Sequence, residues 1–242
     1  FVSKWVMKKF FEGLPYNFKN NCEILYPAIN MLKKFPRKEK IIIFTGKLNS
    51  SKGYDVFGKA ILEVLDKFND WRAYAIGNEK RETYNFKHPN FKVINWLPHK
   101  NILDFYKKSS ISVTCSRWQE PFGRTAMEAA AYGCATITSN RGGLCETFDN
   151  DLILKDLSVT TLKNLVVKII KNPKLLKKIQ RENFKNVIHE MTFLTTKIDN
   201  LKGNFLTKKI NYIKNVNLKI LHISTFDEKN DHRLFNISIA NK

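Results

Sequence analysis

Short apolar runs alternate with amphipathic segments along most of the chain. The run Ile41–Thr45 is apolar up to its last residue and stops at Gly46, which is typical of a strand buried in a parallel sheet. The next segment, Tyr54–Phe68, has apolar side chains at helical spacing. The same alternation predicts further strands at Trp71–Ile76, within Phe91–Leu97, at Ile111–Cys115 and at Ala135–Ser139, and helices at Asn101–Lys107 and Gly123–Tyr132. This cadence predicts an α/β domain with a mostly parallel, doubly wound sheet.

The two ends of this region follow other patterns. Val2–Phe11 predicts a short helix, and Cys22–Tyr26 predicts a short strand. From Ser158 onward the pattern becomes helical, and amphipathic helices are expected at Val159–Lys171 and Pro173–His189. The sheet is therefore expected to be followed by a helical C-terminal part.

One motif, Glu120-Pro-Phe-Gly-Arg-Thr-Ala-Met-Glu128, lies between an expected strand and an expected helix. Glu120 falls on a loop at the carboxyl end of the strand, where parallel sheets bind ligands, and Glu128 falls about one turn into the helix. Between them, the backbone N–H groups that begin the helix favour an anion. Carboxylates for sugar hydroxyls on both sides of a phosphate-binding turn predict a nucleotide diphosphate sugar as the ligand.

A second loop with candidate chemistry, Gly46–Gly53, follows the first buried strand. Gly46 allows a ligand to approach the backbone closely, and Gly53 relieves the turn into the next helix. The loop carries Lys47 and Lys52, whose ammonium groups can converge on one diphosphate and offset its charge as it leaves. Two further loops at strand ends complete the set: Asn95–Pro98, with apolar surface for a base, and Ser139–Glu146, with a double glycine.

Composition limits the class of protein and its partners. The 242 residues are 43% hydrophobic and 26% charged, which suits a soluble globular protein, and no run approaches the roughly 18 apolar residues of a membrane-spanning helix. The net charge of +20 comes from dispersed lysines without a nucleic-acid-binding signature, so we expect no nucleic acid partner. A basic surface does suit peripheral contact with anionic lipid at the inner face of a membrane.

The four cysteines show no paired spacing, which favours a reducing, cytoplasmic compartment and no metal site. Cys115 and Cys134 lie in apolar surroundings and are expected to act as small core residues.

Taken in order, the four loops and their strands resemble the C-terminal, donor-binding domain of GT-B-type retaining glycosyltransferases, the glycosyl transferases group 1 family. The resemblance runs from about Phe1 to about Glu190 and is most specific in the Glu120–Glu128 motif. It implies a Rossmann-like sheet that forms the C-terminal half of a GT-B fold. It also implies a retaining hexosyltransferase that moves sugar from a UDP- or GDP-sugar to a hydroxyl of a glycan or lipid-linked acceptor. Such an enzyme would serve cell-surface polysaccharide or glycolipid synthesis, with no metal or other cofactor.

The resemblance also implies roles for individual residues. Glu120 corresponds to the glutamate that contacts hydroxyls of the donor sugar, and we assign it to sugar positioning and transition-state support rather than to nucleophilic attack. Glu128 corresponds to the ribose-binding glutamate. The remaining donor-binding positions are Phe122, Gly123, Arg124 and Thr125 for the sugar and phosphates, Lys47 and Lys52 with Gly46 and Gly53 for the pyrophosphate, and Leu97 for the base.

Some positions depart from the family pattern or have no role in it. Lys47 stands where the family more often has Arg, and therefore lacks a bidentate fork. Cys145 stands where the family often has Pro. The histidines His88, His99 and His189 have no catalytic spacing and are expected on the surface.

The domain organisation follows from the same resemblance. We expect residues 1–30 to be the end of an acceptor domain and the crossover, 31–195 the donor-binding domain, and 196–215 a linker. The chain opens without an initiator Met and lacks an acceptor domain, so we expect a piece of a longer protein that is inactive alone. Residues 216–242 contain a strand pattern at Leu218–Ser224 and an apolar run at Leu234–Ala240. They predict either the start of a second Rossmann-like domain or a strand and helix that pack back on the donor domain.

Two alternative functions stay open on the sequence. A noncatalytic nucleotide-sugar-binding module of a larger transferase assembly would bind donor without turnover. A different GT-B-shaped enzyme, such as an epimerase or a phosphorylase, would fit less well. Phosphorylases need a lysine context for pyridoxal phosphate that we do not find, and epimerases as a rule lack the glutamate pair.

Overall fold

The computed structural model describes residues 1–12, 22–147, 152–186 and 194–203. The chain divides into two compact units, Phe1–Leu194 and Thr195–Lys242, and a described helix over residues 194–203 begins at their boundary. The predicted strand Leu218–Ser224 and run Leu234–Ala240 lie outside the described residues, as do residues 187–189 of the last predicted helix. The domain boundaries at residues 30, 195 and 215 stay predictions.

Within the described residues, six parallel strands form one sheet in the order β3-β2-β1-β4-β5-β6. The strands are β1 (Glu39–Thr45), β2 (Arg72–Ile76), β3 (Phe91–Ile94), β4 (Ser109–Thr114), β5 (Ala135–Ser139) and β6 (Ile153–Leu154). The chain first moves outward from β1 to β3 and then returns to β4 on the other side of β1. This order confirms the predicted Rossmann-like, doubly wound fold, and its direction reverses between β1 and β4, where such sheets bind ligands.

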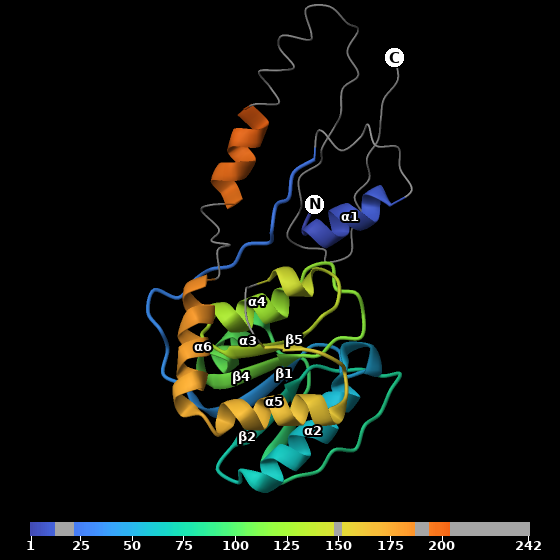
Figure 1. Cartoon of the computed structure of the whole chain (residues 1–242), viewed down its shortest axis with the longest axis vertical. Helices are drawn as coiled ribbons and strands as arrows, with labels where there is room; N and C mark the ends of the chain where they lie inside the picture. Colours follow the sequence, from blue (N-terminus) through green and yellow to red (C-terminus); the bar gives the residue numbers. More distant parts are fainter. Residues whose placement is uncertain (13–21, 148–151, 187–193, 204–242) are drawn as a thin grey trace, which may run out of the picture. The chain divides into compact units, whose positions relative to one another are not determined.

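The helices cover both faces of this sheet. They are α1 (Lys4–Phe11), α2 (Tyr54–Lys67), α3 (His99–Lys108), α4 (Arg124–Ala131), α5 (Val159–Ile170) and α6 (Pro173–Asn186), with short 3₁₀ turns η2 (Ser50–Lys52) and η3 (Gly143–Glu146). Helices α3 and α4 lie on one face, and α2 and α5 lie on the other (Figure 1). All the described helices from α1 to α6 confirm predicted ones, with ends that differ by a few residues. No helix among the described residues is long and apolar enough to cross a membrane.

Two hydrophobic cores lie on opposite faces of the sheet, which explains why the run in β1 is continuously apolar. Ile42 and Phe44 pack with α2 and α5, whereas Ile43 between them packs with α3 and α4. This alternation follows from the two-residue period of a strand. Cys115 and Cys134 are fully buried, so the prediction that they act as core residues is confirmed.

The predicted strand at Cys22–Tyr26 is wrong. These residues have no helical or strand assignment, and their backbone bonds instead go to the first residue of the chain. The Leu25 N–H donates to the Phe1 carbonyl at 2.8 Å, and the Phe1 amino group donates to the Glu23 carbonyl at 2.7 Å. The segment therefore pairs with the start of the chain and packs Tyr26 against Phe122, rather than taking a place in the sheet. Strand β6 was not predicted, because two residues are too short to show a period.

Candidate functional site

A cavity of about 400 Å³ opens at the carboxyl ends of β1 and β4, where the direction of the sheet order reverses. It is lined by the ends of the two strands, the loop before α4, the first residues of α4, and two residues of the N-terminal segments, Val2 and Pro27. Seven residues of the predicted site line it: Gly46, Lys52, Glu120, Phe122, Gly123, Arg124 and Thr125. Residues from two predicted loops, 46–53 and 120–125, therefore meet in one cavity, as their places at strand ends predicted.

The predicted phosphate loop reaches the cavity through Lys52. Asn49 caps the 3₁₀ turn, since its side-chain oxygen accepts the Lys52 N–H at 3.0 Å. Gly53 follows with φ +76°, and a Cβ added there would lie 1.9 Å from the Cys115 carbonyl oxygen. The loop therefore rests directly on the backbone at the end of β4. Lys47, by contrast, is exposed and does not line the cavity, so the structure does not bring the two predicted lysines together.

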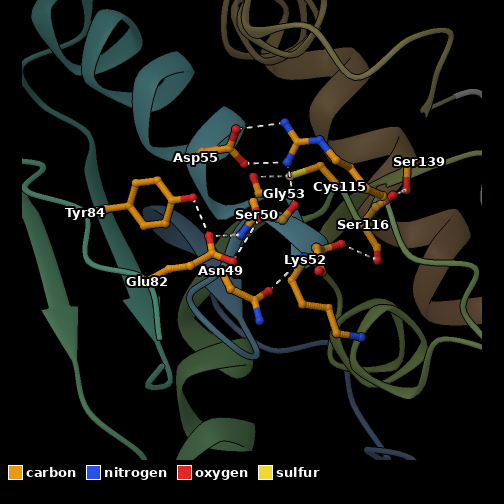
Figure 2. A network of polar contacts seen from close by, with 12 residues as sticks. Asn49, Ser50, Lys52, Gly53, Asp55, Glu82, Tyr84, Cys115, Ser116 and Ser139 are labelled. Atoms are coloured by element: carbon orange, nitrogen blue, oxygen red, sulfur yellow. Dashed lines mark hydrogen bonds and ion pairs between the residues drawn. The ribbon is translucent and has the colours of Figure 1, made fainter. Parts of the chain in front are cut away.

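A network of polar contacts fixes this loop from two sides (Figure 2). Glu82, on the connection after β2, accepts hydrogen bonds from the Ser50 N–H at 2.8 Å and the Ser50 hydroxyl at 2.9 Å. The Tyr84 hydroxyl also donates to Glu82, and together with the Ser50 donors it holds the pKa of that carboxyl below its usual value. Lys52 is thus carried on a loop whose geometry is fixed before any ligand arrives.

An ion pair supports the other side of the loop. Arg117 donates to both carboxylate oxygens of Asp55, at 2.6 and 2.8 Å. Burial alone would raise the pKa of Asp55, but the hydrogen bonds and charge of Arg117 outweigh it and leave the pKa below its usual value. Sequence reasoning missed Glu82, Tyr84 and Arg117, because they lie on irregular loops that give no periodic signal.

Lys52 and Glu120 contact each other across the cavity. The Lys52 Nζ lies 2.5 Å from Glu120 Oε1, and the side chains are 32% and 12% exposed. The resemblance assigned these two groups to different parts of one donor molecule, the pyrophosphate and the sugar. They neutralise each other here, so an anion that contacts Lys52 competes with Glu120 for the charge of the lysine.

The start of α4 forms the anion-facing wall. Gly123 precedes the helix with φ +109° and no side-chain cap, and an added Cβ would lie 2.4 Å from Leu144 Cδ1. Arg124 and Thr125 begin the helix and line the cavity. The positive end of the helix dipole, with its unpaired N–H groups, therefore faces the cavity. This wall can stabilise a negatively charged group close to Lys52.

Glu128 lies further along α4 and forms a second part of the site. It is 6% exposed, and its Oε1 lies 3.1 Å from His99 Nε2 and 3.5 Å from Arg124 Nη2. His99 begins α3, two residues after Leu97, which packs at the edge of the core beneath α3 and α4. Glu128 and Leu97 do not line the 400 Å³ cavity. His99 is exposed, as expected, although its contact with Glu128 was not predicted. This contact joins two helices, α3 and α4, that are distant in sequence, so no local pattern indicated it.

The described residues contain no group of three or more His, Cys, Asp or Glu side chains that could hold a metal ion. The expectation that the reaction needs no metal stays a prediction. The site combines Lys52 and the start of α4, which suit an anion, with the carboxylates of Glu120 and Glu128, which suit hydroxyl groups.

Comparison with known protein families matches residues 30–186 to the family described as "Glycosyl transferases group 1". Among curated proteins, spore coat protein SA of Bacillus subtilis is 31% identical over 134 residues, which are 49% of this chain and 36% of that protein. The chain spans less than half the length of each of four curated relatives.

Two solved structures have a similar fold. The C-terminal domain of the glycosyl transferase group 1 family protein LpcC from Francisella tularensis is 27% identical with a TM-score of 0.55, and the match covers 66% of this chain and 92% of that domain. Anabaena Alr3699/HepE in complex with UDP and glucose is 12% identical with a TM-score of 0.69, covering 84% of this chain and 62% of that one. The second likeness is one of fold.

Proposed function

The chain belongs to the glycosyl transferases group 1 family, and from this premise we propose that it forms the donor-binding part of a retaining hexosyltransferase. The enzyme would move a sugar from a UDP- or GDP-sugar to a hydroxyl of a glycan or lipid-linked acceptor. The observation that carries the proposal is the single cavity in which Lys52, Glu120 and the start of α4 meet. These groups offer an anion site and a carboxylate for hydroxyls within reach of one small ligand.

The geometry supports a separate role for each group toward one part of the donor molecule. The diphosphate would lie against Lys52 and the N–H groups that begin α4, which offset the charge that grows on the leaving group. Glu120 would hold hydroxyls of the sugar and support the positive charge that develops at its ring. Glu128 would bind the ribose, next to His99, with the base near Leu97.

In the proposed reaction the bond between the anomeric carbon and the phosphate oxygen breaks, and a bond to the acceptor oxygen forms on the same face. The acceptor's hydroxyl proton passes to the departing phosphate oxygen. Lys52 and the helix dipole would supply the charge stabilisation, without a metal ion. The Lys52–Glu120 pair separates as donor binds, which leaves each group free for its own part of the ligand.

Relatives support a role in polysaccharide or glycolipid synthesis. HepE, of the same fold, was solved in complex with UDP and glucose, and two relatives are described as proteins of the cps region of Klebsiella pneumoniae. We place the protein in the cytoplasm, with peripheral contact at the inner face of a membrane through its basic surface, since the net charge is +20.

Replacing Lys52 by alanine is expected to weaken binding of UDP or GDP by about 1.5–3 kcal/mol, because a charge-assisted hydrogen bond to phosphate is lost. Glu128→Ala should weaken binding of the same nucleotides through the ribose without unfolding the domain. Isothermal titration calorimetry of both variants with UDP and with GDP measures the effect. Lys59→Ala is the matched control, because Lys59 is an exposed lysine of α2.

Undiminished affinity for both nucleotides in the Lys52 and Glu128 variants would contradict the site assignment. A noncatalytic binding module would give the same calorimetry but no turnover in any longer form of the protein. Binding therefore tests the site, and transfer tests the enzyme.

A further inference from the structure

The N-cap residue of α1 is tied to the loop that carries Glu120. Ser3 is fully buried, and its hydroxyl donates to the Pro121 carbonyl at 2.6 Å. The same oxygen accepts the Val6 N–H at 3.0 Å, which caps the helix. Ser3 therefore uses one hydroxyl to begin α1 and to hold the residue next to Glu120.

Glu146 anchors the same helix through both of its carboxylate oxygens. Oε1 accepts the Trp5 N–H at 2.8 Å, and Oε2 accepts the Lys4 N–H at 2.8 Å. The Tyr26 hydroxyl donates to Oε2 at 3.1 Å. Burial, followed by this hydrogen bond, raises the pKa of Tyr26 to about 12. A carboxylate at the positive end of a helix dipole is a stabilising arrangement, so Glu146 fixes where α1 begins.

Gly142 and Gly143 pack closely against both the Glu120 loop and Ser3. The Gly143 N–H donates to the Glu120 carbonyl at 2.7 Å, and Gly142 forms a parallel bridge with Glu120. A Cβ added at Gly143 would lie 2.3 Å from the Pro121 carbonyl oxygen and 2.8 Å from the Ser3 hydroxyl. The loop before α4 is therefore clamped between η3 and the N-terminal segment.

We propose that Ser3 and Glu146 are positioning residues that hold the Glu120 carboxylate where the donor sugar would bind. Neither residue lines the cavity, so both act through the backbone of the loop, whereas their neighbour Val2 is part of the cavity wall. The role rests on the proposed function, because it assumes that a sugar lies against Glu120. Ser3 and Glu146 should then matter for the sugar and not for the nucleotide, which contacts Lys52 and Glu128.

The binding test compares nucleotides with and without their sugar. Ser3→Ala and Glu146→Gln are titrated calorimetrically with UDP, UDP-glucose, GDP and GDP-mannose. Both variants should bind UDP or GDP within about twofold of wild type, while the affinity for the matching nucleotide sugar falls about tenfold, the loss of roughly one hydrogen bond to a charged group. Glu12→Gln is the matched control, because Glu12 is an exposed carboxylate that follows α1 and forms an ion pair with Lys9.

The second readout needs no ligand. The Gly143 N–H donates to the Glu120 carbonyl. Amide hydrogen exchange at Gly143 should therefore accelerate about tenfold in both variants and stay unchanged in Glu12→Gln. If wild type binds none of the four nucleotides, the proposed function fails, and exchange at Gly143 still decides whether the loop is held by these residues. Equal loss of nucleotide and nucleotide sugar, or unchanged exchange at Gly143, overturns the positioning role. If Glu146→Gln does not fold, Ser3→Ala, which removes one hydroxyl, decides alone.

Discussion

Replacing Glu120 by glutamine is expected to lower sugar transfer about 10²–10³-fold, the usual cost of losing one preorganised group aimed at charge in the transition state. Glutamine keeps the size of the side chain and can still bond a sugar hydroxyl. It loses the negative charge that would face the positive charge developing on the sugar ring. The loss should therefore appear mainly in kcat rather than in donor affinity.

The same substitution should strengthen binding of UDP or GDP that carries no sugar. In the wild-type chain Glu120 Oε1 lies 2.5 Å from the Lys52 Nζ, so a diphosphate competes with this carboxylate for the lysine and is repelled by its charge. Glutamine removes that competitor and its repulsion. Because Lys52 is 32% exposed, the gain is limited to about 1 kcal/mol, or roughly fivefold in affinity.

Calorimetry on this chain measures the nucleotide affinity, and a donor-consumption assay measures transfer in any form of the protein that is active. Glu12→Gln again removes an exposed carboxylate as the control. Sugar transfer at the wild-type rate in Glu120→Gln would contradict the assignment of Glu120 as the catalytic residue. Weaker UDP and GDP binding would instead show that Glu120 helps to hold the diphosphate.

Sequence patterns predicted the sheet and its helices because the apolar positions in the sequence are the ones buried between the sheet and the helices. The run Ile41 to Phe44 is apolar at every position since alternate side chains enter different cores. The same reasoning failed at Cys22–Tyr26, where backbone hydrogen bonds reach Phe1 and Tyr26 packs against the core beside Phe122. A hydrophobic run shows that a segment is covered, but it does not show what covers it.

The candidate site likewise contains residues that the sequence could predict and contacts that it could not. Glu120 and the residues that begin α4 could be placed from sequence, because strand ends and helix starts have fixed positions in a parallel sheet. The contacts of Glu128 with His99 and of Glu146 with α1 could not. Each contact joins segments that are distant in sequence, and no sequence spacing indicates such a contact. Lys47 and Lys52 illustrate the limit: both lie on the predicted loop, but only Lys52 turns toward the cavity.

Substituting alanine for Gly53 is expected to destabilise the domain by about 2–6 kcal/mol. The φ of +76° costs a residue with a side chain roughly 1–3 kcal/mol. The added Cβ would also lie 1.9 Å from the Cys115 carbonyl oxygen, and forcing such an overlap into packed structure costs about 1–3 kcal/mol more. This is a large part of the 5–15 kcal/mol that typically stabilises a domain.

Gly46→Ala separates the two causes, because Gly46 has a φ of +141° but no atom within 4 Å of an added Cβ. It should therefore cost only the backbone strain, roughly 1–3 kcal/mol. Urea denaturation of both variants gives the comparison. Since the Gly53 overlap can be relieved only by moving the loop off the end of β4, Gly53→Ala should also displace Lys52 and weaken UDP or GDP binding more than Gly46→Ala does. Equal destabilisation by the two substitutions would mean that the loop is not seated on Cys115 as the structure has it.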